Sequence, residues 1–199
     1  MTRLTRSLKS PGIGIIGLMH SVRQFEKELQ RLYQSLSESD RYSSALFSQS
    51  SEPVRLLLVH LSWHQAYCDL YRIFLTGYRE AAPSSMLQGI NKQEIQERRA
   101  LCMQHAIAIV HLLVEFSEDC TAQVIDFDAA ICAYHSARLV LFIAGTNPSA
   151  HSLSQTDALQ MARFCRFILE RFFAATPMAK PIVSASLCGQ IPLTISFLG

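Results

Sequence analysis

Three residues that can bind a metal ion, His60, His64 and Cys68, follow one another at intervals of four residues. In a helix this spacing places the three side chains on one face, and imidazole and thiolate are ligands of zinc. Leu61 follows His60, so the glutamate of the HExxH metalloproteases is missing here. Further ligands would have to come from His105, His111 or His135. The segment therefore fits either a metal-dependent helical enzyme that uses His60 and His64, or histidines that are hydrogen-bonded inside a bundle.

A charged pair, Asp69 and Arg72, lies in the same segment at positions i and i+3, where two side chains meet on one helix face. A later apolar segment carries His135 and Arg138. An unpaired charge is costly to bury, so each of these groups must find a partner or line a wet cavity. Two interpretations follow: a polar network that fixes the packing of the helices, or a ligand pocket whose polar groups orient a mostly apolar molecule.

The glycines of Gly12-Ile-Gly-Ile-Ile-Gly17 match the GxGxxG pattern of dinucleotide-binding folds. That fingerprint needs a buried strand before it and a βαβ unit around it, whereas Pro11 precedes it and the flanking sequence shows no such pattern. The sequence contains neither a GxSxG elbow nor a P-loop. A Cys–His nucleophile stays open, because such partners meet only in the fold. We expect no enzyme, no catalytic residue and no bound cofactor.

The composition predicts one domain with a large core, since 49% of the 199 residues are hydrophobic and only 17% are charged. The net charge is +2 and the basic residues are scattered, so we expect no direct contact with nucleic acid. No uninterrupted apolar run approaches the roughly 18 residues of a membrane span, so we expect no membrane contact. The six cysteines form no CxxC pair, which favours reduced, buried thiols.

The apolar residues recur at helical spacing, and no segment alternates as a strand does. The expected helix starts, marked by capping residues or by a first-turn proline, are Ser21, Pro53, Asn91 with Glu94, Asp126 or Asp128, and Ser154 with Asp157. The segment that ends at Gly145 is apolar nearly all round, which places it at the centre. The pattern predicts an all-α helical bundle of about five to seven helices with a buried central helix and no substantial sheet.

Three regions divide the chain. Residues 1–20 are basic and rich in glycine, and we expect a loose leader there; a targeting peptide is the alternative, although Pro11 and the glycines would interrupt its helix. Residues 21–175 form the predicted helical domain, and residues 176–199 form an apolar tail.

Three segments carry a family resemblance. The first is His64-Gln-Ala-Tyr-Cys-Asp-Leu-Tyr-Arg72 with the following Gly77-Tyr-Arg-Glu-Ala-Ala-Pro83. The second is Asp126-Phe-Asp-Ala-Ala-Ile-Cys-Ala-Tyr-His-Ser-Ala-Arg-Leu-Val-Leu-Phe142, and the third is Asp157-Ala-Leu-Gln-Met-Ala-Arg-Phe-Cys-Arg-Phe-Ile-Leu169. In this order they resemble the C-terminal part of the regulatory domain of fungal zinc-cluster (Zn2Cys6-type) transcription factors, the fungal-specific transcription factor domain. The first segment departs from the family pattern, because three residues and not four separate its histidine from its cysteine.

The resemblance implies a nuclear regulator of transcription whose helical domain contacts other transcription proteins or a second copy of itself, or responds to an apolar small molecule. The positions that match the family motif are His64, Cys68, Asp69, Tyr71 and Arg72, which we expect to act in packing and in a polar network. The family's DNA-binding module holds two zinc ions in a six-cysteine cluster that begins C-x-x-C. This chain has no such spacing, so no residue is assigned to zinc, and we expect either a fragment or a stand-alone relative.

Overall fold

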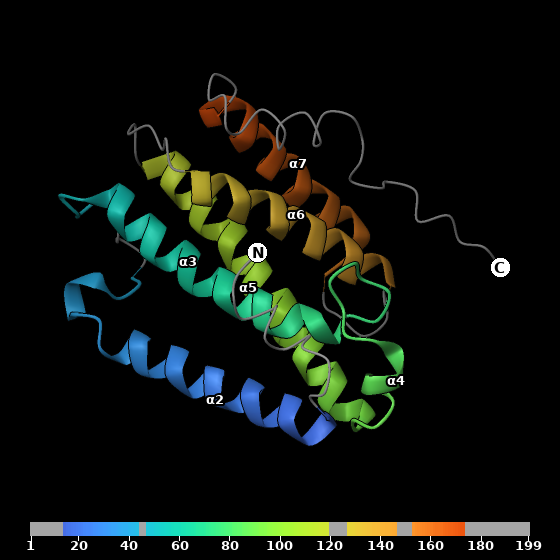
Figure 1. Cartoon of the computed structure of the whole chain (residues 1–199). Helices are drawn as coiled ribbons and strands as arrows, with labels where there is room; N and C mark the ends of the chain where they lie inside the picture. Colours follow the sequence, from blue (N-terminus) through green and yellow to red (C-terminus); the bar gives the residue numbers. More distant parts are fainter. Residues whose placement is uncertain (1–13, 44–46, 120–126, 147–152, 174–199) are drawn as a thin grey trace.

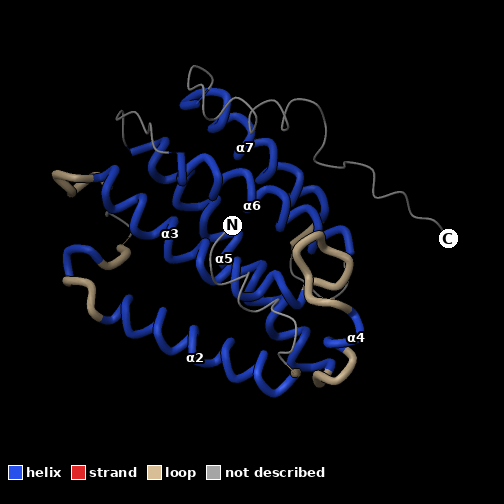
Figure 2. Tube along the Cα trace, in the orientation of Figure 1, coloured by secondary structure: helices blue, strands red, loops and turns tan. Residues whose placement is uncertain are grey.

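Helices joined by turns make up the parts of the chain that the computed structural model describes, residues 14–43, 47–119, 127–146 and 153–173, and no strand occurs in them (Figure 2). The helices in these ranges are α2 (Ile15–Gln34), α3 (Pro53–Tyr71), α4 (Ser84–Leu87), α5 (Lys92–Asp119), α6 (Phe127–Thr146) and α7 (Gln155–Phe173). Two 3-10 turns, η1 (Glu38–Asp40) and η2 (Arg72–Phe74), complete them. The prediction of an all-α bundle is confirmed.

The centre of the bundle is formed by α5 and α6. Helix α6 packs against α5, α7 and α3, and α5 also packs against α3 and α7. Figure 1 shows α2 and α7 at opposite edges of the bundle. Helix α6 buries small residues, which let its neighbours approach closely: Ala129, Ala130, Ala133, Ala137 and Ala144. The segment predicted as central is therefore central, and α5 shares that position.

The first helix begins earlier than its sequence pattern predicts. Helix α2 starts at Ile15 with Gly14 as its N-cap, whereas Ser21 was the expected cap. Its first two turns bury Leu18 and Met19, because these side chains join the hydrophobic core. The prediction of a loose leader is therefore wrong for residues 15–20. Residues 1–13 of that leader, like residues 176–199 of the predicted tail, lie outside the described residues.

The segment that carries His60, His64 and Cys68 forms α3, with Pro53 in its first turn as predicted. It ends at Tyr71, and the 3-10 turn η2 carries the chain on to Phe74. Gly77 then has a φ of +85°, a left-handed conformation that favours glycine.

The predicted cap of α5, Asn91, is confirmed, and α6 ends close to the predicted stop at Gly145. The backbone N–H of Gln93 donates to Oδ1 of Asn91 at 2.8 Å, which caps α5. Helix α6 has Asp128 in its first turn, but it continues through Gly145 to Thr146. The described part of α6 therefore ends one residue beyond the predicted stop at Gly145, and there the Thr146 hydroxyl donates to the carbonyl of Phe142 at 2.9 Å.

Ser154 caps α7: its Oγ accepts the backbone N–H of Asp157 at 3.1 Å and donates to the Asp157 carboxylate at 2.7 Å. We expect Ser154→Ala to lower the free energy of unfolding by about 1 kcal/mol, because one N–H at the helix start loses its acceptor. Urea denaturation followed by circular dichroism measures this loss. Thr156→Ala, two residues further on and exposed, is the matched control and should cost nothing, since alanine has the higher helix propensity.

Helix α2 is held to the bundle by few contacts. It buries Leu18, Met19 and Val22. The indole N–H of Trp63 donates to the carbonyl of Leu29 at 3.3 Å, and Glu26 pairs with Arg98 of α5. Helix α2 therefore packs on α3 through a narrow apolar stripe, and polar contacts lie on either side of that stripe.

By length and composition alone, two of the helices that the structure describes could cross a membrane. They are residues Lys92–Glu118 of α5 and Phe127–Thr146, which is α6. Both occupy the bundle centre, and a helix enclosed by other helices needs the same apolar surface. Their hydropathy is therefore weak evidence for a membrane span.

Candidate functional site

A cavity of about 240 Å³ lies between α3 and α6. Both helices contribute polar side chains to it, and the mouth includes two exposed ones, Ser62 and Asp128. The residues that line this α3/α6 cavity are Ser62, Gln65, Ala66, Asp69, Arg72, Asp128, Ile131, Cys132 and His135. It is a half-open hollow to which several polar residues contribute.

A buried ion pair forms the inner end of the cavity. Nη2 of Arg72 lies 3.1 Å from Oδ1 of Asp69, and the side chains are 2% and 7% exposed. Gln65, one helical turn before Asp69, donates from Nε2 to the same carboxylate oxygen at 2.9 Å. The predicted pairing of Asp69 with Arg72 is therefore confirmed. Spacings of four and three residues place Gln65, Asp69 and Arg72 on one face of the chain as it leaves α3.

Several buried polar atoms at the cavity have no hydrogen-bond partner among the described protein groups. They are Nε and Nη1 of Arg72, Oε1 of Gln65 and Nδ1 of His135. Such orphaned atoms are rare in native proteins and each costs free energy when it stays dry. Both donors and acceptors occur among them.

His135 brings a neutral ring into this charged surrounding. Burial, and then the positive charge of Arg72, lowers the pKa of His135 to about 4, while Asp69 acts in the opposite direction. Arg138, the other polar residue predicted on this helix, lies with its guanidinium carbon 5.4 Å from the ring centre of Tyr78 and 5.6 Å from that of Tyr134. At neutral pH the charged groups at the cavity itself are therefore Arg72 and the two aspartates.

The other family-motif residues lie on the opposite side of α3, toward α5. His64 faces His105, with 2.9 Å between the two Nδ1 atoms. The thiol of Cys68 is fully buried and donates to the carbonyl of Cys102 at 3.9 Å, and burial raises the pKa of Cys68. The guanidinium of Arg98 lies 5.6 Å from the centre of the Tyr71 ring. The five motif positions thus serve two faces: Asp69 and Arg72 line the cavity, and the others join α3 to α5.

The histidines with metal-ligand spacing do not converge. His60 makes a 3.0 Å hydrogen bond from Nε2 to the carbonyl of Asp40, while His64 bonds to His105. Cys68 bonds to a backbone carbonyl, as described above. Within the described residues, no group of three or more His, Cys, Asp or Glu side chains is placed to hold a metal ion.

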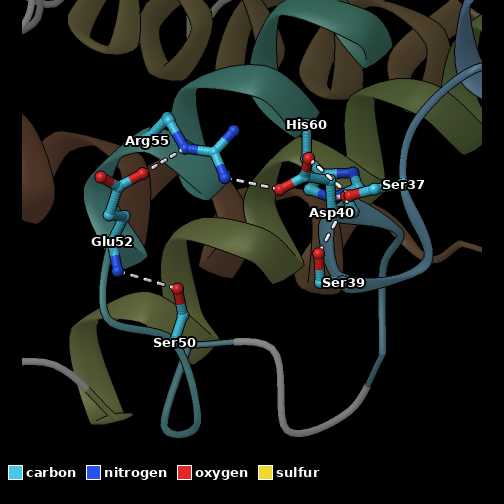
Figure 3. Close-up of polar contacts among 7 residues, drawn as sticks. All are labelled: Ser37, Ser39, Asp40, Ser50, Glu52, Arg55 and His60. Carbon is cyan, nitrogen blue, oxygen red and sulfur yellow. Dashed lines mark hydrogen bonds and ion pairs between the residues drawn. The ribbon is translucent and has the colours of Figure 1, made fainter.

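Sequence reasoning missed a second polar cluster at the start of α3, which Figure 3 shows. Arg55 bridges Asp40 at 2.5 Å and Glu52 at 2.6 Å. Hydrogen bonds from Arg55, and then from Ser37, lower the pKa of Asp40. Arg55 is half exposed, so this cluster is a solvent-exposed ion-pair network that links η1 to α3. The i, i+3 spacing of Glu52 and Arg55 was the signal that could have revealed half of it.

The buried histidines make stability depend on pH. Burial lowers the pKa of His64 to about 3, with His105 as the second cause, and lowers that of His105 to about 4. Unfolded histidines titrate near pH 6.5. The stability that these neutral rings contribute is therefore fully present above pH 6.5 and is lost as the pH falls toward 4, because only the unfolded chain takes up the protons.

We expect the free energy of unfolding to fall by up to about 1.4 kcal/mol per pH unit below pH 6 for each such histidine. Urea denaturation at pH 7.5, 6 and 5 measures this slope. His64→Phe/His105→Phe removes both titrations and should make the slope shallower, whereas His111→Asn, at an exposed position of α5, should leave it unchanged. An identical slope in the double variant would contradict the assignment.

Comparison with known proteins identifies no relative: no family model matches the chain, and neither a curated protein nor a solved structure matches it.

Proposed function

We propose that this chain is a regulatory domain of a fungal zinc-cluster type transcription factor, acts in the nucleus and catalyses no reaction. The observation that carries the proposal is the position of the Asp69–Arg72 pair. Two residues of the family-like motif, charged and buried in a helical bundle, line a cavity between α3 and α6. A domain that only packs has no need to bury charge there, because an apolar pair of similar volume is often as stable.

The order of the resembling segments adds support. They lie on α3, α6 and α7, and α6 packs against both of the other helices. A molecule bound in the α3/α6 cavity would contact two helices at once and would stabilise the arrangement in which they are together. The domain would thereby report the presence of the molecule to other transcription proteins or to a second copy. DNA binding and the zinc cluster would belong to a separate module, since this sequence has no C-x-x-C pair.

A transcription reporter tests the proposal. The chain is fused to an unrelated DNA-binding domain in yeast, and reporter expression is compared with that of the DNA-binding domain alone. We expect expression to change by several-fold in either direction. Phe116→Ala, which disrupts the core, should abolish the change, whereas Phe167→Ala, at a half-exposed position, should not. Equal expression from fusion and control at equal protein level would contradict the proposal.

The alternative of a metal-dependent helical enzyme predicts a different result. Zinc or iron would then co-purify in stoichiometric amount and would be lost from His60→Ala/His64→Ala. Elemental analysis of the folded wild-type chain separates the two functions, because the regulatory proposal assigns no metal to these residues.

A further inference from the structure

We infer that Cys68 of α3 and Cys102 of α5 form a site of reversible oxidation, at which hydrogen peroxide joins the two thiols in a disulfide that links α3 to α5. Both thiols are free and fully buried. The inference goes beyond the proposed function and does not depend on it, because the chemistry concerns only these two side chains and the contact between their helices.

The antiparallel contact between α3 and α5 places the two cysteines opposite each other. At one point of this contact His64 is hydrogen-bonded to His105 at 2.9 Å. Further along α3, the guanidinium carbon of Arg98 lies 5.6 Å from the centre of the Tyr71 ring. The cysteines lie between these two contacts, three or four residues from each of them on their own helices, so they face each other across the same interface.

The contacts between the two cysteines are reciprocal. Sγ of Cys68 lies 3.9 Å from the carbonyl oxygen of Cys102, and Sγ of Cys102 lies 3.9 Å from the carbonyl oxygen of Cys68. The two thiols are also hydrogen-bonded to each other. A disulfide requires two cysteines whose backbones approach closely and whose side chains point toward each other. Each thiol here reaches the backbone of the other residue, so the pair shows that arrangement.

In the described part of the chain, the two further cysteines are placed differently. The thiol of Cys132 on α6 donates to the carbonyl of Leu61 at 3.9 Å, and Leu61 lies two helical turns before Cys68 on α3. Cys165 belongs to α7 and is fully buried. The packing therefore favours a disulfide between α3 and α5 over one that involves α6 or α7.

The oxidation takes place in two steps. The thiolate of one cysteine attacks an oxygen of hydrogen peroxide, the O–O bond breaks, and the hydroxide that leaves takes up the thiol proton and becomes water. The sulfur is then a sulfenic acid. The thiol of the second cysteine attacks this sulfur, the S–S bond forms, the S–O bond breaks, and a second water leaves. Two thiols are oxidised to one disulfide, and one peroxide is reduced to two waters.

The buried position makes this oxidation slow. Burial, and then the hydrogen bond with Cys102, raises the pKa of Cys68. The thiolate is the form that reacts, so little of it is present at neutral pH. The reaction therefore takes place during transient local opening of the contact between α3 and α5, and the incubation with peroxide has to be long.

Peptide mapping after oxidation tests the inference. The purified full chain is incubated with hydrogen peroxide at pH 7.5 without denaturant, catalase removes the excess, and the remaining thiols are alkylated in denaturant before proteolysis and mass spectrometry. We expect a pair of peptides linked through Cys68 and Cys102, two hydrogen atoms lighter than the separate thiol peptides, which a reducing agent separates. Cys68 and Cys102 that are alkylated or overoxidised without this link, or a link from Cys68 to Cys132, would overturn the inference.

Two variants provide the control. Cys68→Ala removes one member of the pair and should leave Cys102 unlinked, whereas Cys165→Ala makes the same change at an equally buried thiol of α7 and should form the same link as the wild type. If Cys68→Ala does not fold by circular dichroism, Cys102→Ala removes the pair from the other helix. The Cys68–Cys102 link should raise the midpoint of urea unfolding, because it restricts the unfolded chain. A link that forms only in urea would show that the folded chain does not bring the thiols together, and would reject the site.

Discussion

Replacement of Arg72 by leucine should lower the free energy of unfolding by about 3–5 kcal/mol, because it leaves the carboxylate of Asp69 buried without its cation. The side chains of Arg72 and Asp69 are 2% and 7% exposed, so the carboxylate is largely shielded from solvent when its partner is lost. Urea denaturation at pH 7, followed by circular dichroism, measures the loss. Arg166→Leu, which breaks an exposed pair with Glu170 on α7, is the matched control and should cost less than about 1 kcal/mol.

The double variant Asp69→Leu/Arg72→Met separates the cost of an unpaired charge from the value of the pair. Removal of both charges together should restore most of the stability that Arg72→Leu loses, since an apolar pair of similar volume is often neutral or stabilising. A double variant as unstable as Arg72→Leu would show instead that the ion pair itself stabilises the bundle. Restored stability would mean that the ion pair is not needed to hold the bundle together.

Replacement of Phe116 by alanine should be the other severe change, with a loss of about 3–5 kcal/mol. Phe116 of α5 is 1% exposed, and its ring meets that of Phe47 edge to face with 5.4 Å between the centroids. Truncation removes buried apolar surface, leaves a cavity and breaks this aromatic pair. The midpoint of urea unfolding and the melting temperature should both fall.

Phe167→Ala deletes the same side chain at a position of α7 that is 50% exposed, and it serves as the control. Its ring lies on the surface beneath Arg171, so truncation creates no internal cavity. We expect a loss well below that of Phe116→Ala. Equal losses at the two positions would mean that α5 does not pack in the core as described.

The sequence predicted the helices well where the signals were local. Pro53, Asn91 and Ser154 mark helix starts through their own backbone and side chains, and all three starts are confirmed. The start of α2 was wrong because the glycines there were taken as breaks in the helix. Tertiary contacts overrode that tendency, since Leu18 is buried against the core and helix propensity is only a weak guide beside packing.

In the candidate site, too, the local contacts could be predicted from the sequence and the contacts between distant segments could not. The Asp69–Arg72 pair was predictable because its members are spaced i, i+3 in the sequence. The contact of His64 with His105 joins residues 41 positions apart, and no periodicity within a single helix encodes it. The cavity depends on the distance between α3 and α6, so its polar groups could be identified from the sequence but their convergence could not.

Trp63, the only tryptophan of the chain, lies where α2 meets the rest of the bundle. Its indole donates to a carbonyl of α2, and its ring packs on Tyr33, 4.5 Å away, and on His105 of α5 at 5.6 Å. Tryptophan emission is therefore sensitive to the docking of α2 on the rest of the bundle. If α2, with its few buried residues, separates first during denaturation, tryptophan emission will change before the circular dichroism signal of the remaining helices does.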